Sequence, residues 1–157
     1  MNTGDLLTNA ARSYPDHPAF IFEGASRTYR ESGARSDGLA RALVAARVGR
    51  GDRVALYLRN DIPFFEASYA AGMLGAYATP VNWHYTEDEV RYLFENSGAK
   101  AIVIHADLLA PVAAVTPPGS SVLVVETPEE IAEAYGIEPA RRRVPPSALE
   151  WDRWLEG

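Results

Sequence analysis

Short runs of apolar residues alternate, through the middle of the chain, with segments in which apolar residues recur every three or four positions. The apolar runs are RVALYL (53–58), AYATPVN (76–82), KAIVIH (100–105) and SVLVVE (121–126). The segments between them, 62–74, 87–97 and 107–115, have helical spacing. Strands that alternate with helices of this length pair in parallel, because each connection crosses back over the sheet. The pattern predicts an α/β fold, with a mainly parallel sheet flanked by helices.

The first part of the chain has a different pattern. Apolar positions in 5–13 predict a short helix, which the prolines of YPDHP end. The segment 19–31 contains two short strand-like runs separated by a Glu-Gly pair, and it predicts a β-hairpin. Helical spacing returns over 30–46, and we expect a glycine of the following GRGDR stretch to cap that helix.

Several helix ends carry sequence signals of their own. Thr or Ser followed three residues later by Glu predicts helix starts at 86–89, 127–130 and 147–150, because such side chains satisfy the first free amides. Gly98 and Gly136 suit the left-handed conformation just past a helix. The last start precedes Leu149, Trp151 and Trp154, and it predicts a short terminal helix.

The pattern predicts a single α/β unit over 1–157. Its expected parts are a helix and hairpin over 1–50, alternating strands and helices over 51–135, and an Arg/Pro-rich tail with a terminal helix over 136–157. A hydrophobic content of 47% is sufficient for a core in a chain of 157 residues.

Charge and composition exclude several classes of function. The chain has 15 basic and 21 acidic residues and a net charge of −6, which argues against a nucleic-acid partner. It contains no cysteine, so disulfides and thiolate chemistry are excluded. Neither a signal peptide nor an apolar run long enough to span a membrane is present. We therefore expect a cytoplasmic chain without a membrane span.

Residues alone do not predict a catalytic set. His17, His84 and His105 lack partners at ligand spacing, so no metal site is predicted, and His105 is expected to hydrogen-bond in or near the core. The acidic residues of 87–89 are expected to complement the start of a helix. Three further motifs are interpreted as connections: RGD (50–52) and TPPGSS (116–121) as turns, and Arg141–Arg143 as a solvated linker, with a phosphate clamp left as the alternative.

The order of several motifs resembles a known family. The motifs are Thr28-Tyr29-Arg30-Glu31, Gly51-Asp52-Arg53-Val54, Asn60, the Ala/Gly-rich segment Gly72–Asn82, and Asn96–Lys100. Together they resemble the N-terminal portion of acyl-CoA synthetases, in particular the fatty-acyl-CoA synthetases, of the adenylate-forming, AMP-binding superfamily. The resemblance covers residues 5–109 and, more loosely, the remainder.

The resemblance implies a parent acid–thiol ligase that converts a carboxylic or fatty acid, ATP and CoA to acyl-CoA, AMP and pyrophosphate, with Mg²⁺. The ATP-binding motifs of that family do not occur in the sequence, so we expect the fragment alone to bind none of these cofactors and to be inactive. In some relatives a basic residue at the position of His84 faces the CoA nucleotide, and the resemblance therefore implies a CoA contact for His84. Asn82 is expected to brace the turn, and Trp83 to pack.

An alternative from a different class is a stand-alone α/β module without catalysis. Such a module would bind a small ligand or a protein at the carboxyl ends of its strands. The coding sequence downstream of Gly157 distinguishes the two hypotheses. A sheet edge and the Trp residues near the end of the sequence also suggest a homodimer.

Overall fold

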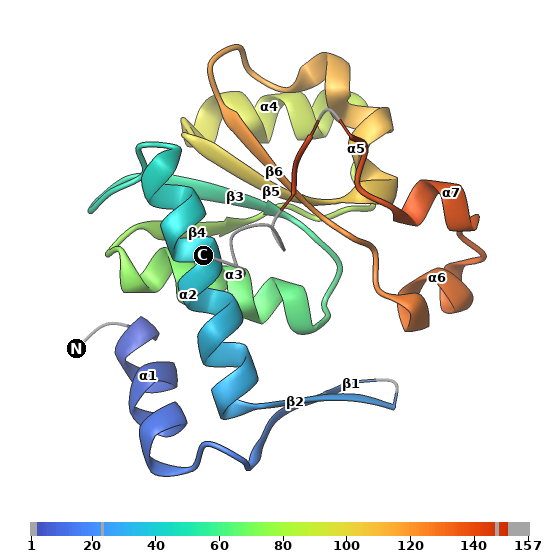
Figure 1. Ribbon diagram of the computed structural model, residues 1–157. Coiled ribbons are helices and arrows are strands. Elements are labelled where there is room, and N and C mark those ends of the chain that lie inside the picture. The colour runs from blue at the N-terminus through green and yellow to red at the C-terminus, as the bar shows by residue number, and fades with distance from the viewer. Residues whose placement is uncertain (1–2, 23, 147, 151–157) are drawn as a thin grey trace.

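The fold is an α/β arrangement in which a parallel sheet lies between helices. The computed structural model describes residues 3–22, 24–146 and 148–150. Its elements are α1 (Thr3–Ser13), β1 (Pro18–Phe22), β2 (Ala25–Thr28), α2 (Tyr29–Ala45), β3 (Arg53–Tyr57), α3 (Ile62–Met73), β4 (Tyr77–Pro80), α4 (Glu87–Ser97), β5 (Ala101–His105), α5 (Ala106–Val112), the 3-10 turn η1 (Ala113–Val115), β6 (Ser121–Val125), α6 (Glu129–Tyr135), α7 (Pro139–Arg142) and β7 (Leu149–Glu150). Figure 1 shows their arrangement.

The sheet confirms the predicted parallel pairing. Within the described residues, five strands pair in the order β4-β3-β5-β6-β7, and every pair in this sheet is parallel. The register places Val54 of β3 opposite Ala78 on one side and Ala101 on the other. The first strand of the sheet in the sequence is thus an inner strand, between β4 and β5.

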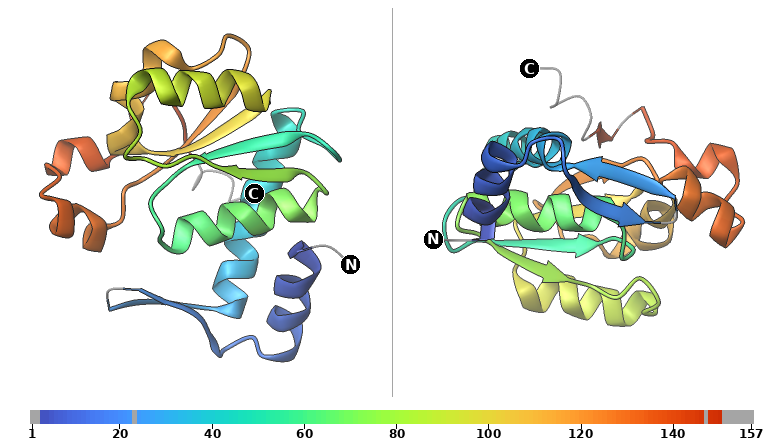
Figure 2. Two further views of the ribbon diagram at one scale, coloured as in Figure 1. Left: turned by 180° about the vertical axis from the view of Figure 1, so that it is seen from behind. Right: turned by 90° about the horizontal axis from the view of Figure 1, so that it is seen from below.

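Alternate residues of the strands build two separate hydrophobic cores. Val54 and Leu56 of β3 face α2 and α3, where Leu39 and Leu43 are fully buried. Ala55 and Tyr57 of the same strand face α4 and α5 instead. Figure 2 shows these helix layers on opposite sides of the sheet. Burying one large aliphatic or aromatic side chain contributes roughly 1.5–3 kcal/mol, so these two cores supply most of the driving force for folding.

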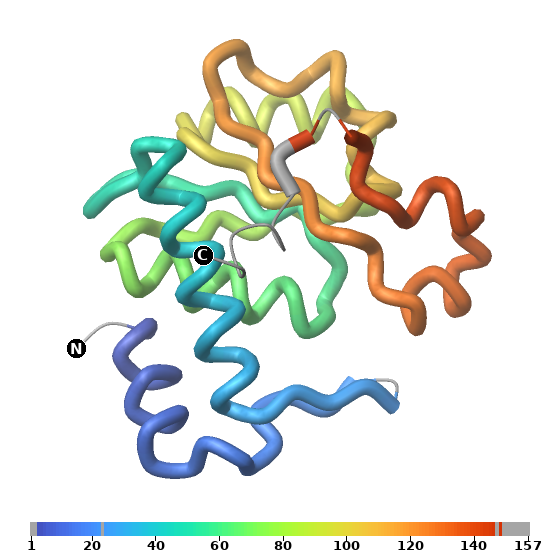
Figure 3. Tube along the Cα trace, in the orientation of Figure 1, coloured from blue at the N-terminus to red at the C-terminus, as the bar shows by residue number. Residues whose placement is uncertain are grey.

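An N-terminal layer packs on the outside of α2 and α3. The predicted helix and hairpin are both present. α1 lies beside the first half of α2, and the hairpin projects away from the start of α2 on the opposite side (Figure 3). A capping box at Thr28 and Glu31 fixes the start of α2. Phe20 of the hairpin stacks on Phe65 of α3, with ring centroids 5.1 Å apart. This aromatic contact attaches the hairpin to the helix layer.

The end of α2 differs from the prediction. The residue in the left-handed conformation is Arg47, with φ 61°, rather than a glycine of the GRGDR stretch. The N–H of Arg47 donates to the carbonyl of Val44, and the N–H of Val48 donates to that of Leu43, which is a Schellman motif. Val48 and Leu43 both belong to the core beneath α2. Burial of Val48 just after the helix therefore places an arginine in the position that usually favours glycine.

The predicted terminal helix is wrong where it can be compared. Leu149 and Glu150 form β7, which pairs in parallel with Leu123 and Val124 of β6. The backbone of β6 has an edge with free hydrogen-bonding groups, and pairing there outweighs the local helix signal. Ser147 and the rest of that prediction, with Trp151, Trp154 and Leu155, lie outside the described residues.

The remaining predictions of local structure are largely confirmed. Gly98 and Gly136 have φ values of 60° and 62°, as expected just past α4 and α6. The Glu89 carboxylate accepts hydrogen bonds from the N–H and hydroxyl of Thr86, which closes the predicted cap of α4. The helix expected over 107–115 ends at Val112 and continues as a 3-10 turn, with Pro111 in its last turn.

A close glycine contact between α1 and α3 gives a stability prediction. A Cβ at Gly4 would lie 2.6 Å from the backbone nitrogen of Met73, whereas a Cβ at Gly33 would meet its nearest atom, Cβ of Ala11, at 3.4 Å. We expect Gly4→Ala to lower the free energy of unfolding by about 1–3 kcal/mol through overpacking. Gly33→Ala is the matched control and should leave stability equal or higher, because alanine favours helix. Urea unfolding measures both, and equal midpoints for the two variants would contradict the contact.

Candidate functional site

A group of buried polar side chains joins the carboxyl ends of β3 and β5. These strands are neighbours, but the chain leaves β3 toward the face covered by α3 and leaves β5 toward the face covered by α5. Ligands of parallel sheets commonly bind where neighbouring connections diverge in this way. We call the group the strand-end cluster, and its members are Arg59, Asp61, His105, Asp107 and Thr127.

A bidentate ion pair forms the centre of the cluster. Nη1 and Nη2 of Arg59 donate to Oδ1 and Oδ2 of Asp107 over 2.9 and 2.7 Å. The Arg59 residue is 5% exposed and Asp107 is 4% exposed. The hydroxyl of Thr127 donates to Oδ1 of Asp107 over 2.6 Å and accepts the N–H of Asp107 over 3.3 Å. The connection after β3, through Arg59, and the connection after β6, through Thr127, are thereby tied to one carboxylate.

This arrangement corrects the predicted cap at Thr127. The Thr127 hydroxyl is committed to Asp107, and the N-cap of α6 is Pro128. Glu130, the expected partner of Thr127 in the cap, instead lines the pocket described below. The capping sequence is present, but the Thr127 hydroxyl donates to Asp107, which is distant in sequence.

His105 lies in the buried part of the cluster, as predicted. Its side chain is fully buried, and Nδ1 accepts the backbone N–H of Arg59 over 3.3 Å. Nε2 of the same ring lies 3.0 Å from Oδ2 of Asp61. Asp61 in turn caps α3, since its Oδ1 accepts the N–H of Phe64.

Asp107 and Tyr57, two residues at this site, have shifted pKa values, and burial and the Arg59 charge act on each pKa in opposite directions. Burial by itself raises the pKa of Asp107, but hydrogen bonds from Arg59 and Thr127 and the Arg59 charge outweigh it, so the pKa lies below its ordinary value. Burial raises the pKa of the Tyr57 hydroxyl, against a smaller opposite effect of the Arg59 charge. Asp107 is therefore charged at neutral pH.

Next to the strand-end cluster lies a pocket of about 770 Å³. Its walls come from the residues that follow β3 (58–60), from the end of β4 and the connection after it (80–85), and from α6, with Phe22, Phe64 and Leu93 completing them. The Arg59 guanidinium carbon lies 4.7 Å from the ring centroid of Trp83 and 5.0 Å from that of Tyr135. Trp83 and Tyr135 thus form an aromatic wall of the pocket, and both rings pack against the buried Arg59 guanidinium.

The stretch Asn82-Trp83-His84 enters this pocket wall. Oδ1 of Asn82 accepts the N–H of His84 over 3.0 Å, so Asn82 braces the turn as expected. Trp83 is half-buried and packs against the core under α4, which confirms its packing role. His84 is exposed, lines the pocket, and has its ring centroid 3.6 Å from that of Trp83.

Other residues singled out in the sequence lie elsewhere. Glu87 and Asp88 pair with Arg91 on the surface of α4, which agrees with a helix-start role. Asp52 of the RGD tripeptide accepts the N–H of Gly49 and pairs with Lys100, so this segment is a turn. His17 is exposed near the hairpin.

Arg141–Arg143 are not a free linker. Residues 139–142 form α7, and Arg142 lies within 3.3 Å of Glu126 and 3.6 Å of Glu129. Nη2 of Arg141 donates to the backbone carbonyl of Asp107 over 3.1 Å. The first two arginines therefore make contacts within the chain.

Sequence reasoning missed Arg59, Asp61, Asp107 and Tyr135. The available signal was position, because the first three directly follow the two apolar strands whose carboxyl ends meet at one edge of the sheet. Within the described ranges no group of three or more His, Cys, Asp or Glu residues is arranged to hold a metal ion. Over the same residues, none of the helices is both long and apolar enough to cross a membrane.

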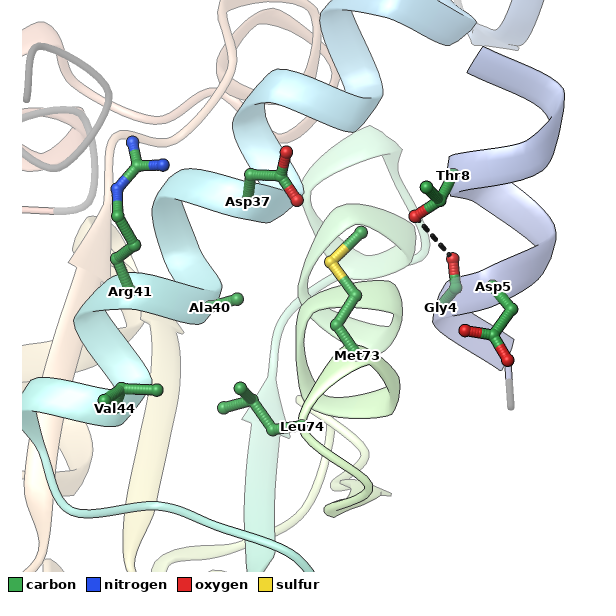
Figure 4. A pocket seen from close by; sticks show the side chains of 9 residues that line it. All are labelled: Gly4, Asp5, Thr8, Asp37, Ala40, Arg41, Val44, Met73 and Leu74. Carbon is green, nitrogen blue, oxygen red and sulfur yellow. Dashed lines mark hydrogen bonds between the residues drawn. The ribbon is translucent and has the colours of Figure 1, made fainter. Parts of the chain in front are cut away.

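A second hollow, of about 520 Å³, lies between α1, α2 and the end of α3. Figure 4 shows Asp37 of α2 and Met73 of α3 directed into the space beside α1, and the Thr8 hydroxyl donating to the Gly4 carbonyl. This hollow contains no member of the strand-end cluster and none of the three histidines. The pocket beside the strand-end cluster is the candidate site.

Comparisons with known proteins agree with this fold. The family model described as AMP-binding enzyme matches residues 7–152. The medium/long-chain-fatty-acid–CoA/3-oxocholest-4-en-26-oate–CoA ligase of Mycobacterium marinum is 36% identical over 129 residues, which are 80% of this chain and 24% of the relative. The 3-oxocholest-4-en-26-oate–CoA ligase of Rhodococcus rhodochrous is 34% identical over 87% of this chain and 25% of the relative. The chain thus spans about a quarter of the length of these curated relatives.

Solved structures give the same result. A benzoate CoA ligase from Burkholderia xenovorans LB400 superposes with a TM-score of 0.79 at 19% identity, over 100% of this chain and 28% of that one. A Mycobacterium tuberculosis fatty acyl CoA synthetase superposes with a TM-score of 0.68 at 27% identity, over 90% of this chain and 29% of that one. The first similarity concerns the fold alone.

The strand-end cluster gives a prediction for stability and its pH dependence. We expect Asp107→Asn to lower the free energy of unfolding at pH 7 by about 3–5 kcal/mol, because it leaves Arg59 buried without a counter-charge. The contribution of the Asp107 charge is present above its unfolded pKa of about 3.9 and is lost as pH falls through the lower folded pKa, so the difference between wild type and variant should shrink on acidification below about pH 4.

Urea unfolding at a series of pH values measures both effects. Asp88→Asn, which breaks an exposed pair with Arg91, is the control and should change stability by less than about 1 kcal/mol. Equal losses for the two variants would contradict a special role for the buried pair.

Proposed function

This chain belongs to the AMP-binding enzyme family, and we propose that it forms the N-terminal part of an acyl-CoA ligase that acts on a carboxylic acid of the fatty-acid class. In the proposed reaction the carboxylate oxygen attacks the α-phosphorus of ATP and pyrophosphate leaves. The CoA sulfur then attacks the acyl carbon, and AMP leaves. An acyl-CoA ligase of this kind would use ATP, Mg²⁺ and CoA in these steps.

The contribution that we propose for this segment is a scaffold and a contact to CoA, with the phosphoryl chemistry supplied by other parts of the ligase. The observation that carries the proposal is the position of His84. Its side chain is exposed at the wall of the 770 Å³ pocket, at the carboxyl ends of parallel strands, and Asn82 fixes its backbone. An imidazole N–H in that place can donate to a phosphate oxygen of a nucleotide.

The residues around His84 fit a nucleotide portion better than a reacting centre. The same pocket contains the exposed amides of Asn60 and Asn82 and the aromatic rings of Trp83 and Tyr135, which are groups that bind polar edges and planar faces. The charged Arg59 and Asp107 are occupied with each other. A cytoplasmic location and a homodimer stay predictions.

A substitution of His84 tests the proposed contact in the full-length ligase. We expect His84→Ala to raise the KM for CoA about 3- to 10-fold, which corresponds to the loss of one hydrogen bond of about 0.5–1.5 kcal/mol. The rate of ATP–pyrophosphate exchange, which reports adenylate formation, should not change. His17→Ala, an exposed histidine beside the hairpin, is the control and should leave both values unchanged. An unchanged KM in His84→Ala would show that this residue does not contact CoA.

The assignment of the phosphoryl chemistry to other parts of the ligase has its own test. Calorimetric titration of the 157-residue chain with Mg-ATP is expected to give only dilution heat, whereas the full-length ligase should give a saturable isotherm. Saturable binding by the chain alone would place an ATP site within these residues and contradict the scaffold role.

A further inference from the structure

Trp83 and His84 lie in a connection that starts from an edge strand. They follow β4, which pairs only with β3 among the described strands. One backbone anchor is the Val81 N–H, which donates to the Leu56 carbonyl over 3.0 Å. A second is the Tyr57 hydroxyl, which donates to the Trp83 carbonyl over 3.5 Å. The core under α4 supports one side of Trp83. The rest of that side chain and the exposed His84 ring need further support to keep one orientation.

Arg59 provides that support for Trp83. The guanidinium carbon, the Trp83 ring and the Tyr135 ring are separated by 4.7, 5.0 and 5.1 Å, so the three groups form a compact triangle. The two rings meet edge to face at 80°. A guanidinium that is desolvated next to aromatic rings is attracted to them more strongly than one in water.

The guanidinium itself cannot move far. Both of its terminal nitrogens are held by Asp107, and Nε is buried without a hydrogen-bond partner among the described residues. Rotation of the side chain would break two charge-assisted hydrogen bonds and leave the Asp107 carboxylate unpaired. Asp107 is fixed in turn by Thr127 and, through its backbone carbonyl, by Arg141. The aromatic wall of the pocket therefore packs against an Arg59 guanidinium that is held in one orientation.

His84 is coupled to this triangle through Trp83. The two ring centroids are 3.6 Å apart with an interplanar angle of 33°, which is direct ring contact. We propose that Arg59 is a positioning residue, which holds Trp83 and through it orients the His84 ring toward the nucleotide of CoA. This inference rests on the proposed CoA contact of His84. It adds that the contact depends on a buried ion pair that does not itself touch the ligand.

The test uses the full-length ligase and removes both charges together. Arg59→Met alone would leave Asp107 buried and unpaired, so the main variant is Arg59→Met with Asp107→Asn. We expect this double variant to raise the KM for CoA 3- to 10-fold, as His84→Ala does, and to leave ATP–pyrophosphate exchange unchanged. Added to His84→Ala, it should raise the KM no further, because both changes remove the same contact. Arg59→Lys should restore part of the loss, since lysine keeps a charge beside the rings.

A second variant avoids the buried pair. Tyr135 is 53% exposed on α6, and Tyr135→Ala removes one side of the triangle without leaving a charge unpaired. We expect a rise of two- to threefold in the KM for CoA, again absent in the His84→Ala background. Tyr92→Ala, which removes a similarly exposed tyrosine from α4 outside the pocket wall, is the control and should not change the KM.

The outcomes separate the two proposals. An unchanged KM in His84→Ala overturns the CoA contact, and the positioning role with it. A raised KM in His84→Ala, together with normal values in the Arg59/Asp107 and Tyr135 variants or with fully additive effects, overturns only the positioning role. If the Arg59/Asp107 variant lowers pyrophosphate exchange as much as thioester formation, the ion pair has a general structural role and the positioning role is also overturned.

Discussion

The ion pair between Arg59 and Asp107 sets a constraint on the whole sheet. Taking two charges out of water costs several kcal/mol for each ion, and only near-ideal geometry offsets that cost. The bidentate contact provides such geometry, and the Thr127 hydroxyl adds a third hydrogen bond to the carboxylate. A shift of one residue in the register between β3 and β5 would move every side chain to the opposite face and separate the pair. The buried charges thus favour one register in a sheet whose apolar residues are similar on both faces.

The features that the sequence predicted are those with local causes. Alternating apolar runs predicted the strands, Thr86 and Glu89 predicted the start of α4, and the position of His105 at the end of an apolar run predicted its burial. The family resemblance, carried by several motifs in order, is confirmed by the match over residues 7–152. The hydrogen bond from the His84 N–H to Asn82 is another local interaction, since the two residues are two positions apart.

The features that were missed depend on partners distant in the sequence. Thr127 has the sequence of a helix cap, but its hydroxyl bonds Asp107, 20 residues earlier. Arg47 takes the left-handed position because Val48 must reach the core. For Arg59 the sequence offers only its position after an apolar strand, since its partner lies 48 residues further on. Family membership accounts for the fold, whereas the roles proposed for Arg59 and Tyr135 rest on the contacts of these particular side chains.

The strand order β4-β3-β5-β6-β7 has a consequence for the way the protein is made. β3 is the first strand of this sheet to leave the ribosome, but it lies inside the sheet. Both of its edges therefore stay unpaired until its neighbours have been synthesised. β4 covers one edge, and the other stays free until β5 emerges. Domains fold from the N-terminus while synthesis proceeds. Arg59 is therefore released well before Asp107, and it has no counter-charge until Asp107 has left the exit tunnel. Closure of the ion pair therefore fixes β5 beside β3 at a stage when β6 and β7, which follow Asp107 in the chain, have still to join the sheet.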